Sequence, residues 1–253
     1  MPRQCCFCFC TKVTREHLWG EWIGELLGQR EYRFDRKHRG VKAGPWDSDS
    51  LNMKARVACA ACNNGWMSDL EVATKLIIGD VLQNGTAKTF TAPELAMLAT
   101  LVFTKAMVAG AMGSLPDFLS FGERSTFRRT LRIPNGVHMW FGRFPNGMRG
   151  VWKEDRIATA GNTSRDFKGQ VFTFGFGFLF IQAVTARWKK PNTGRTTDNI
   201  RLTQDERWAA ASTPFWPLPN SSVEWPPTHD LPYDSIDALS DRWKTVKLFE
   251  RLR

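Results

Sequence analysis

Three features are missing from this 253-residue sequence, and each narrows the class of protein. It contains no internal repeat, which argues against a solenoid or other repeat architecture. Its longest apolar stretch, from Leu95 to Met112, is interrupted by Thr100, Thr104 and Lys105 and falls short of a clean membrane span of about 20 residues. We interpret this stretch as a buried helix. The N-terminus has no basic stretch followed by an apolar run, so we find no secretory signal and expect a cytoplasmic protein with no membrane partner.

Acidic residues are scarce relative to basic ones. The chain has 25 Asp and Glu against 35 Lys and Arg, which gives a formal net charge of +10. Polyanions are attracted to such a protein at low salt, because each phosphate neutralised by Lys or Arg releases condensed counterions. The charge therefore favours a nucleic-acid partner, although a soluble enzyme with a basic surface has the same composition.

The six cysteines fall into two groups far apart in the chain: Cys5, Cys6, Cys8 and Cys10, and then Cys59 and Cys62. In a reducing compartment such spacing suits a metal better than disulfides. Cys5-x-x-Cys8 together with Cys59-x-x-Cys62 supplies the four thiolates of a closed structural Zn2+ site. Cys6 and Cys10 are an alternative first pair, since both spacings can chelate an ion. We favour Cys5 and Cys8 because C-x-x-C is the commoner knuckle.

The N-terminal segments predict two paired strands followed by two helices. Residues 11–17 and 54–58 have the pattern of short strands that could pair, and a long polar loop, broken by Gly40, Gly44 and Pro45, is expected between them. A helix is expected from Cys62 to about Gln83. Trp66, Leu70, Ala73 and Ile77 recur on one of its faces, and Asn84-Gly85 should end it. Thr91-Ala-Pro-Glu94 should cap a second helix that runs to about Met112.

The rest of the chain mixes strand and helix signals. Strands are expected at 137–141 and 170–184, and five phenylalanines of the second strand should share one face: Phe172, Phe174, Phe176, Phe178 and Phe180. A short helix should begin at residues 203–206, and Asp234 should cap a last helix that reaches Leu252. The segment 214–232 should wrap the body. We therefore expect an α+β fold with a zinc-bound ββα module at residues 1–85 and an α+β body at residues 86–253 that positions substrate.

Glu16-His17 follows the first cysteine pair, and Asn63 directly follows the second. This order resembles the HNH, or His-Me finger, endonucleases, whose pattern is C-x-x-C, an acidic residue and His, then C-x-x-C followed by His or Asn. The resemblance covers about residues 5 to 71, and the run Cys-Asn-Asn-Gly-Trp from Cys62 is similar to a phage and bacterial subgroup.

The resemblance implies a specific chemistry. His17 would be the catalytic base that takes a proton from water as it attacks phosphorus. Glu16 and Asn63 would hold Mg2+ or another divalent ion, while the zinc would only fix strand against helix. The implied activity is hydrolysis of phosphodiester bonds in nucleic acid, with DNA favoured over RNA.

The sequence departs from the family pattern in two places. The family's asparagine before the second knuckle has only Asn52 as a counterpart, and Trp66 stands near the place of its helical lysine. Asn64 or Glu71 could complete the metal site instead of Asn63. An inactive HNH-derived module that binds nucleic acid or a protein therefore stays open. His17 as a core histidine, Glu16 as a solvated residue and Asn63 as a helix cap are the corresponding structural interpretations.

A basic segment follows the second helix. Between Arg124 and Arg156 it interleaves cations with aromatic residues, a pattern that could track a nucleic-acid backbone. The residues expected to bind are Arg124, Arg128, Arg129 and Arg132. A solvated basic face would show the same pattern.

Overall fold

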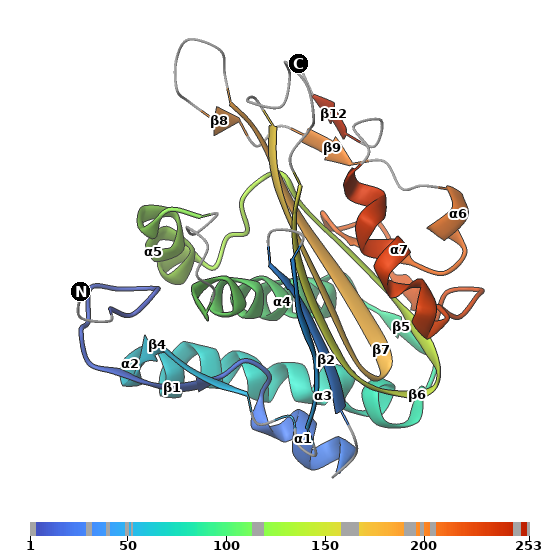
Figure 1. Ribbon diagram of the computed structural model, residues 1–253, viewed down its shortest axis with the longest axis horizontal. Coiled ribbons are helices and arrows are strands. Elements are labelled where there is room, and N and C mark those ends of the chain that lie inside the picture. The colour runs from blue at the N-terminus through green and yellow to red at the C-terminus, as the bar shows by residue number, and fades with distance from the viewer. Residues whose placement is uncertain are drawn as a thin grey trace.

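The computed structural model describes residues 4–28, 32–38, 41–48, 51, 53–112, 119–157, 167–189, 196–197, 200–202, 206–244 and 249–251. The fold is mixed α+β, as expected. Its centre is a long, twisted antiparallel pair of strands with helices against both faces (Figure 1).

The first two predicted strands pair with each other. β1 (Val13–His17) runs antiparallel to β4 (Lys54–Cys59), with Val13 opposite Cys59 and His17 opposite Lys54. The first cysteine knuckle precedes the start of β1, and the second begins at the end of β4. Because antiparallel strands bring the start of one beside the end of the other, the pairing carries both knuckles to the same end of this small sheet.

A long helix follows β4, as the sequence predicts. It consists of α2 (Ala60–Cys62), a π-helical turn η1 (Asn63–Met67) and α3 (Ser68–Asn84), with a kink at Gly65. Gly85, in the left-handed conformation, ends it at the predicted stop. The most buried face of α3 is formed by Thr74, Ile78, Val81 and Leu82, one position further along than the predicted face.

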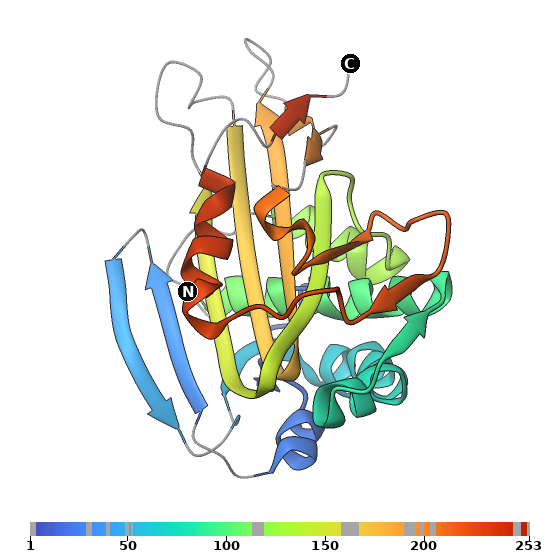
Figure 2. The ribbon, with the colours of Figure 1, turned by 90° about the vertical axis from the view of Figure 1, so that its right-hand side faces the viewer.

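The segment expected to be a polar loop is instead folded, so that prediction is wrong. It forms α1 (Glu21–Leu27) and a hairpin of β2 (Tyr32–His38) with β3 (Val41–Ser48). Gly44 and Pro45 do not prevent the pairing, because they lie at a register shift where the hydrogen-bond ladder is already interrupted. The hairpin stands beside β6 of the body sheet (Figure 2).

Four strands make the body sheet, in the order β10-β6-β7-β8. Their bounds are β6 Val137–Ile157, β7 Phe167–Lys189, β8 Thr196–Thr197 and β10 Thr213–Trp216. Both predicted strands are present and extend well beyond their predicted ends. α4 (Ala92–Met112) and α3 pack against one face of β7, and α7 (Ile236–Asp241) packs against the other (Figure 1).

The expected single face of phenylalanines is wrong beyond Gly177. Phe172, Phe174 and Phe176 belong to the largest core cluster, but Phe180 packs into a different cluster on the opposite face. Gly177 has φ +54°, and the β6–β7 register shifts at this point. The positive φ of Gly177 interrupts the alternation of side chains along β7, so Leu179 and Ile181 join the largest cluster, against which Phe178 is only partly buried.

The remaining elements are short. They are β5 (Lys88–Phe90), α5 (Phe121–Thr130), β9 (Ile200–Leu202), α6 (Glu206–Ala209), β11 (Val223–Trp225), η2 (Tyr233–Ser235), η3 (Arg242–Lys244) and β12 (Phe249–Arg251). The helix expected to reach Leu252 is wrong in its extent, because residues 249–251 form a strand paired with β9. The segment 214–232 wraps the body as predicted, with Trp225 fully buried. Residues 203–205, where the short helix was expected to begin, lie outside the described residues.

The largest hydrophobic cluster is continuous from Cys5 in the first knuckle, through α4, to Trp225. Among the described residues, α4 alone is long and apolar enough to cross a membrane, but 67% of its most apolar window is buried inside the fold. The predicted buried helix is therefore confirmed. The division at residue 85 stays a prediction, since one core contains residues from both sides of it.

Candidate functional site

The four predicted zinc ligands converge at the start of β1 and the end of β4. The sulfur atoms of Cys5, Cys8, Cys59 and Cys62 all lie within 4.8 Å of one another. Cys8 Sγ is 3.6 Å from Cys59 Sγ and 4.0 Å from Cys62 Sγ. A tetrahedral ion with Zn–S bonds of about 2.3 Å needs sulfurs about 3.8 Å apart. These four cysteines could therefore hold a metal such as zinc.

The alternative first pair lies outside this cluster. Cys10 is exposed, and its thiol contacts the Lys12 carbonyl at 3.7 Å. Cys6 is buried, and its backbone amide donates to the carbonyl of Val57, which ties the knuckle to β4. The first pair of the four-cysteine cluster is therefore Cys5 and Cys8, as predicted.

The surroundings of the cysteine cluster shift the pKa values of its thiols and of a neighbouring arginine. Burial raises the pKa of the Cys59 thiol, but hydrogen bonds from the Cys62 backbone amide and from neighbouring thiols outweigh it and lower the pKa to about 7. The electrostatic influence of the nearby cysteines, Cys62 first, raises the pKa of the Arg128 guanidinium. Trp66, four residues after Cys62, packs edge-on against Phe7 of the first knuckle, with ring centroids 5.2 Å apart. Burial instead raises the pKa of the Cys8 and Cys62 thiols, so the lowered pKa of Cys59 is a local shift toward the thiolate form that binds metal.

The four arginines expected to bind nucleic acid have different surroundings. Arg124 is buried, and its Nε and Nη1 donate to the carbonyls of Cys6 and Leu119 at 2.8 and 2.6 Å, which anchors α5 to the first knuckle. Arg128 is half-buried beside the cysteines, while Arg129 and Arg132 are exposed. Of the four, only the last two are exposed side chains.

A pocket of about 260 Å³ lies at the opposite end of β1. Its lining joins β1, α1 and the helix after the second knuckle: Glu16, His17, Glu21, Asn63, Asn64, Ser68 and Glu71. The three residues for which the resemblance implies catalytic roles, Glu16, His17 and Asn63, thus line one pocket. His17 is half-buried in this lining.

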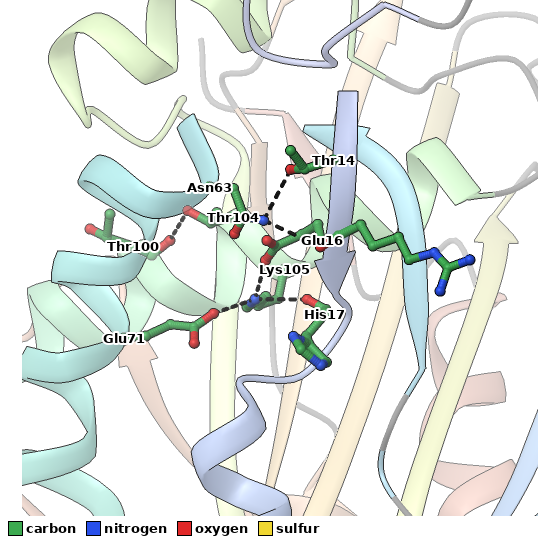
Figure 3. A network of polar contacts seen from close by, with 9 residues as sticks. Thr14, Glu16, His17, Asn63, Glu71, Thr100, Thr104 and Lys105 are labelled. Carbon is green, nitrogen blue, oxygen red and sulfur yellow. Dashed lines mark hydrogen bonds and ion pairs between the residues drawn. The ribbon is translucent and has the colours of Figure 1, made fainter. Parts of the chain in front are cut away.

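A buried lysine contacts three residues of this pocket's lining. Lys105 of α4 is 5% exposed, and its Nζ lies 2.8 Å from Glu16 Oε1, 2.5 Å from Glu71 Oε1 and 2.9 Å from the carbonyl oxygen of His17 (Figure 3). Burial raises the pKa of Glu16, and the charge of Lys105 opposes that rise. Glu16 is therefore a buried partner of a cation and not a solvated strand residue.

Asn63 joins the helix to β1. Its Nδ2 donates to Thr14 Oγ1 at 3.2 Å and to the Arg15 carbonyl at 3.3 Å (Figure 3). The amide thus fixes the helix start against the strand that carries His17, and no side-chain capping bond is found at this helix start. Asn52, the weak counterpart of the family's asparagine, lies outside the described residues.

The predicted pair of divalent-metal ligands does not fit well. Glu16 is already engaged with Lys105, and Asn63 directs its NH2 group to β1. In the described part of the chain, the four cysteines are the only group of three or more His, Cys, Asp or Glu side chains close enough to share an ion. Mg2+ needs only one or two carboxylates, with waters and substrate oxygens completing its shell. Glu71 and Asn64, the alternative weighed from the sequence, both line the pocket. Glu71 also contacts Lys105, but its side chain is more exposed than that of Glu16 and is therefore easier for an ion to reach.

Sequence reasoning missed Lys105 as a site residue. It was noticed only as an interruption of the apolar stretch 95–112. A single charge on a helix that is otherwise buried must find a buried counter-charge, because an unpaired ammonium is very costly in the interior. That signal predicts a partner but does not identify Glu16, which lies 89 residues away in the chain.

The chain was compared with models of protein families, with curated proteins and with solved structures, and none of the three comparisons found a match. The site therefore has to be interpreted from its own geometry.

Proposed function

We propose that this protein is a metal-dependent, HNH-like endonuclease that hydrolyses phosphodiester bonds in nucleic acid, with DNA favoured over RNA. The observation that carries the proposal is the pocket at the end of β1, where His17 lines a hollow of about 260 Å³ together with carboxylate, amide and hydroxyl side chains. The residue order that resembles the HNH endonucleases is the second support.

In this proposal His17 is the base. Its imidazole takes a proton from the attacking water, which requires the neutral ring. Lys105 holds the backbone carbonyl of His17, and Asn63 holds the adjacent strand, so both are positioning residues for the imidazole. The zinc cluster fixes the other end of β1 against the start of the helix.

The charge of the pocket explains why a divalent cation belongs to the proposal. The lining contains three carboxylates, those of Glu16, Glu21 and Glu71. Lys105 is the shared counter-charge of Glu16 and Glu71. A phosphate would be repelled from such a pocket unless a further cation entered with it. Glu71 and Asn64 are the groups we propose to hold Mg2+ or a similar ion, which when bound would neutralise charge on the phosphate oxygens.

A rival function is favoured by the same contacts. If no ion binds at Glu71 and Asn64, the Glu16–Lys105 pair and the Asn63 hydrogen bonds still keep the shape of the site, but the site lacks a catalytic ion. The chain would then be an inactive HNH-derived module that binds nucleic acid or a protein partner.

The experiment measures cleavage of supercoiled DNA, single-stranded DNA and RNA in the presence of Mg2+, Mn2+ or Ni2+. His17→Ala is compared with the wild type, and His229→Ala serves as the matched control because His229 is exposed and outside the pocket. We expect metal-dependent cleavage that His17→Ala lowers by at least about 100-fold and His229→Ala leaves unchanged. Binding without cleavage under all three metals would favour the rival, and neither binding nor cleavage would reject both nucleic-acid functions.

A further inference from the structure

Phe9 directly follows Cys8 of the first knuckle, and its aromatic ring belongs neither to the cysteine cluster nor to the pocket lining. Phe9 is 76% exposed, while Phe7, two residues earlier, is fully buried in the core. Keeping a phenylalanine side chain in water forgoes about 1.5–3 kcal/mol of burial energy. The exposed ring is therefore a candidate contact surface for a partner molecule.

Phe9 is held on one side by helix α5. Its ring centroid lies 4.5 Å from that of Phe121, the first residue of α5, at an interplanar angle of 45°. The capping box of Ser120 and Glu123 fixes this helix start, and Arg124 binds the helix to the knuckle through the Cys6 carbonyl. Phe9 is thus an exposed ring on a rigid support.

Exposed cations lie on both segments that carry this pair of rings. Lys12 is exposed three residues after Phe9, and Arg129 and Arg132 are exposed at and just beyond the end of α5. The acidic residue of α5, Glu123, is engaged by Arg187 and by the capping box. Along the helix axis, Phe121 and Arg129 are about 12 Å apart, the length of three to four stacked nucleotides.

We propose that Phe9 is a stacking platform for an unpaired base of single-stranded nucleic acid, whose phosphates lie along the basic end of α5. Every base has a π-face, so an exposed aromatic ring beside cations binds single strands without sequence preference. In a duplex both faces of a base are already covered by its neighbours, so the ring gains nothing there. The cations on the Phe9 segment and at the end of α5 favour a polyanion over an apolar protein surface. This inference rests on the proposed function only in naming nucleic acid as the partner.

The test measures the affinity of a fluorescent oligothymidine of about 12 nucleotides, and of a hairpin duplex, by anisotropy. It uses the His17→Ala background with no added divalent ion, so that binding is read without cleavage. We expect Phe9→Ala and Phe9→Leu to raise the Kd for the single strand about tenfold or more, and Phe9→Trp to retain it. Duplex affinity should change less than about twofold. Leu76→Ala is the matched control, because Leu76 is an equally exposed apolar residue on α3.

The leucine variant separates base stacking from apolar docking. If Phe9→Leu binds the single strand as tightly as the wild type, or if all Phe9 variants leave the Kd unchanged, the proposal is overturned. Zinc content and circular dichroism check that each variant is folded. If Phe9→Ala weakens binding but no substrate is cleaved, the stacking platform stands and the nuclease proposal fails. If cleavage depends on His17 but Phe9→Ala leaves the single-strand affinity unchanged, the nuclease proposal stands and the stacking platform fails.

Discussion

At the scale of single residues, Lys105 balances the charge of the pocket. It is the shared cation of Glu16 and Glu71, and both Lys105 and Glu16 are buried. The Asn63 amide and the Lys105 ammonium both bind to the backbone of β1, one at Arg15 and the other at His17. The geometry of the proposed base is therefore set by two polar groups from different helices.

Removing that cation should be costly. Lys105→Met leaves Glu16 buried without a partner, and we expect the free energy of unfolding to fall by about 3–5 kcal/mol. The additional change Glu16→Gln should recover part of the loss, because it removes the uncompensated charge. Urea unfolding measures both, with Lys75→Met as the control, since Lys75 is exposed on α3. An unchanged midpoint for Lys105→Met would mean that the ion pair contributes nothing.

The cysteines allow a matched comparison at the same scale. Cys59→Ser should lose bound zinc and lower the thermal midpoint by several degrees or more, because a structural zinc site contributes directly to folding. Cys10→Ser should leave both unchanged, since Cys10 is exposed and outside the cluster. Elemental analysis and thermal unfolding measure the two effects. Wild-type protein purified without any bound metal would contradict the assignment.

At the scale of elements, the break in side-chain alternation at Gly177 of β7 decides which side chains reach the core. Gly177 packs directly against the carbonyl group of Leu82 at the end of α3. This close approach couples the body sheet to the helix that begins at the second cysteine knuckle. A side chain at this position would have to displace one element from the other.

Gly177→Ala should therefore destabilise the fold by about 3 kcal/mol, from the clash with Leu82 together with the positive φ. Gly24→Ala in α1 is the control, because its added methyl group would make only an ordinary contact with Leu51. That control should be neutral or slightly stabilising, since alanine favours helix. Chemical denaturation compares the two variants, and equal midpoints would argue against the close packing.

At the scale of the whole molecule, the net charge of +10 should govern nucleic-acid affinity. The logarithm of the affinity for a single strand should fall linearly with the logarithm of salt concentration, by about 0.7 per phosphate contacted. Arg129→Gln and Arg132→Gln should each reduce that slope by about one contact, whereas Arg124→Gln should act through stability, since Arg124 is buried. Titrations at several salt concentrations measure the slopes. Slopes unaffected by either exposed arginine would reject their role in binding.

The local parts of the fold were predictable from short stretches of sequence. The strands at 11–17 and 54–58, the helix stop at Asn84-Gly85 and the cap at Thr91 depend on residues within a few positions of one another. The hairpin of β2 and β3 was missed because glycine and proline there lie at a register shift, which a local pattern does not reveal. The phenylalanine row failed for the same reason at Gly177.

By itself, the sequence determined two cysteine pairs, the strand and helix that each pair adjoins, and a histidine beside one of them, since all of these follow from spacing along the chain. Only the tertiary structure decided that Cys5 and Cys8, and not Cys6 and Cys10, face Cys59 and Cys62. It also decided that Glu16 meets Lys105. The physical reason is that metal and ion-pair geometry depends on which side chains the packed core brings within a few ångströms, and residues far apart in sequence carry no local record of that distance.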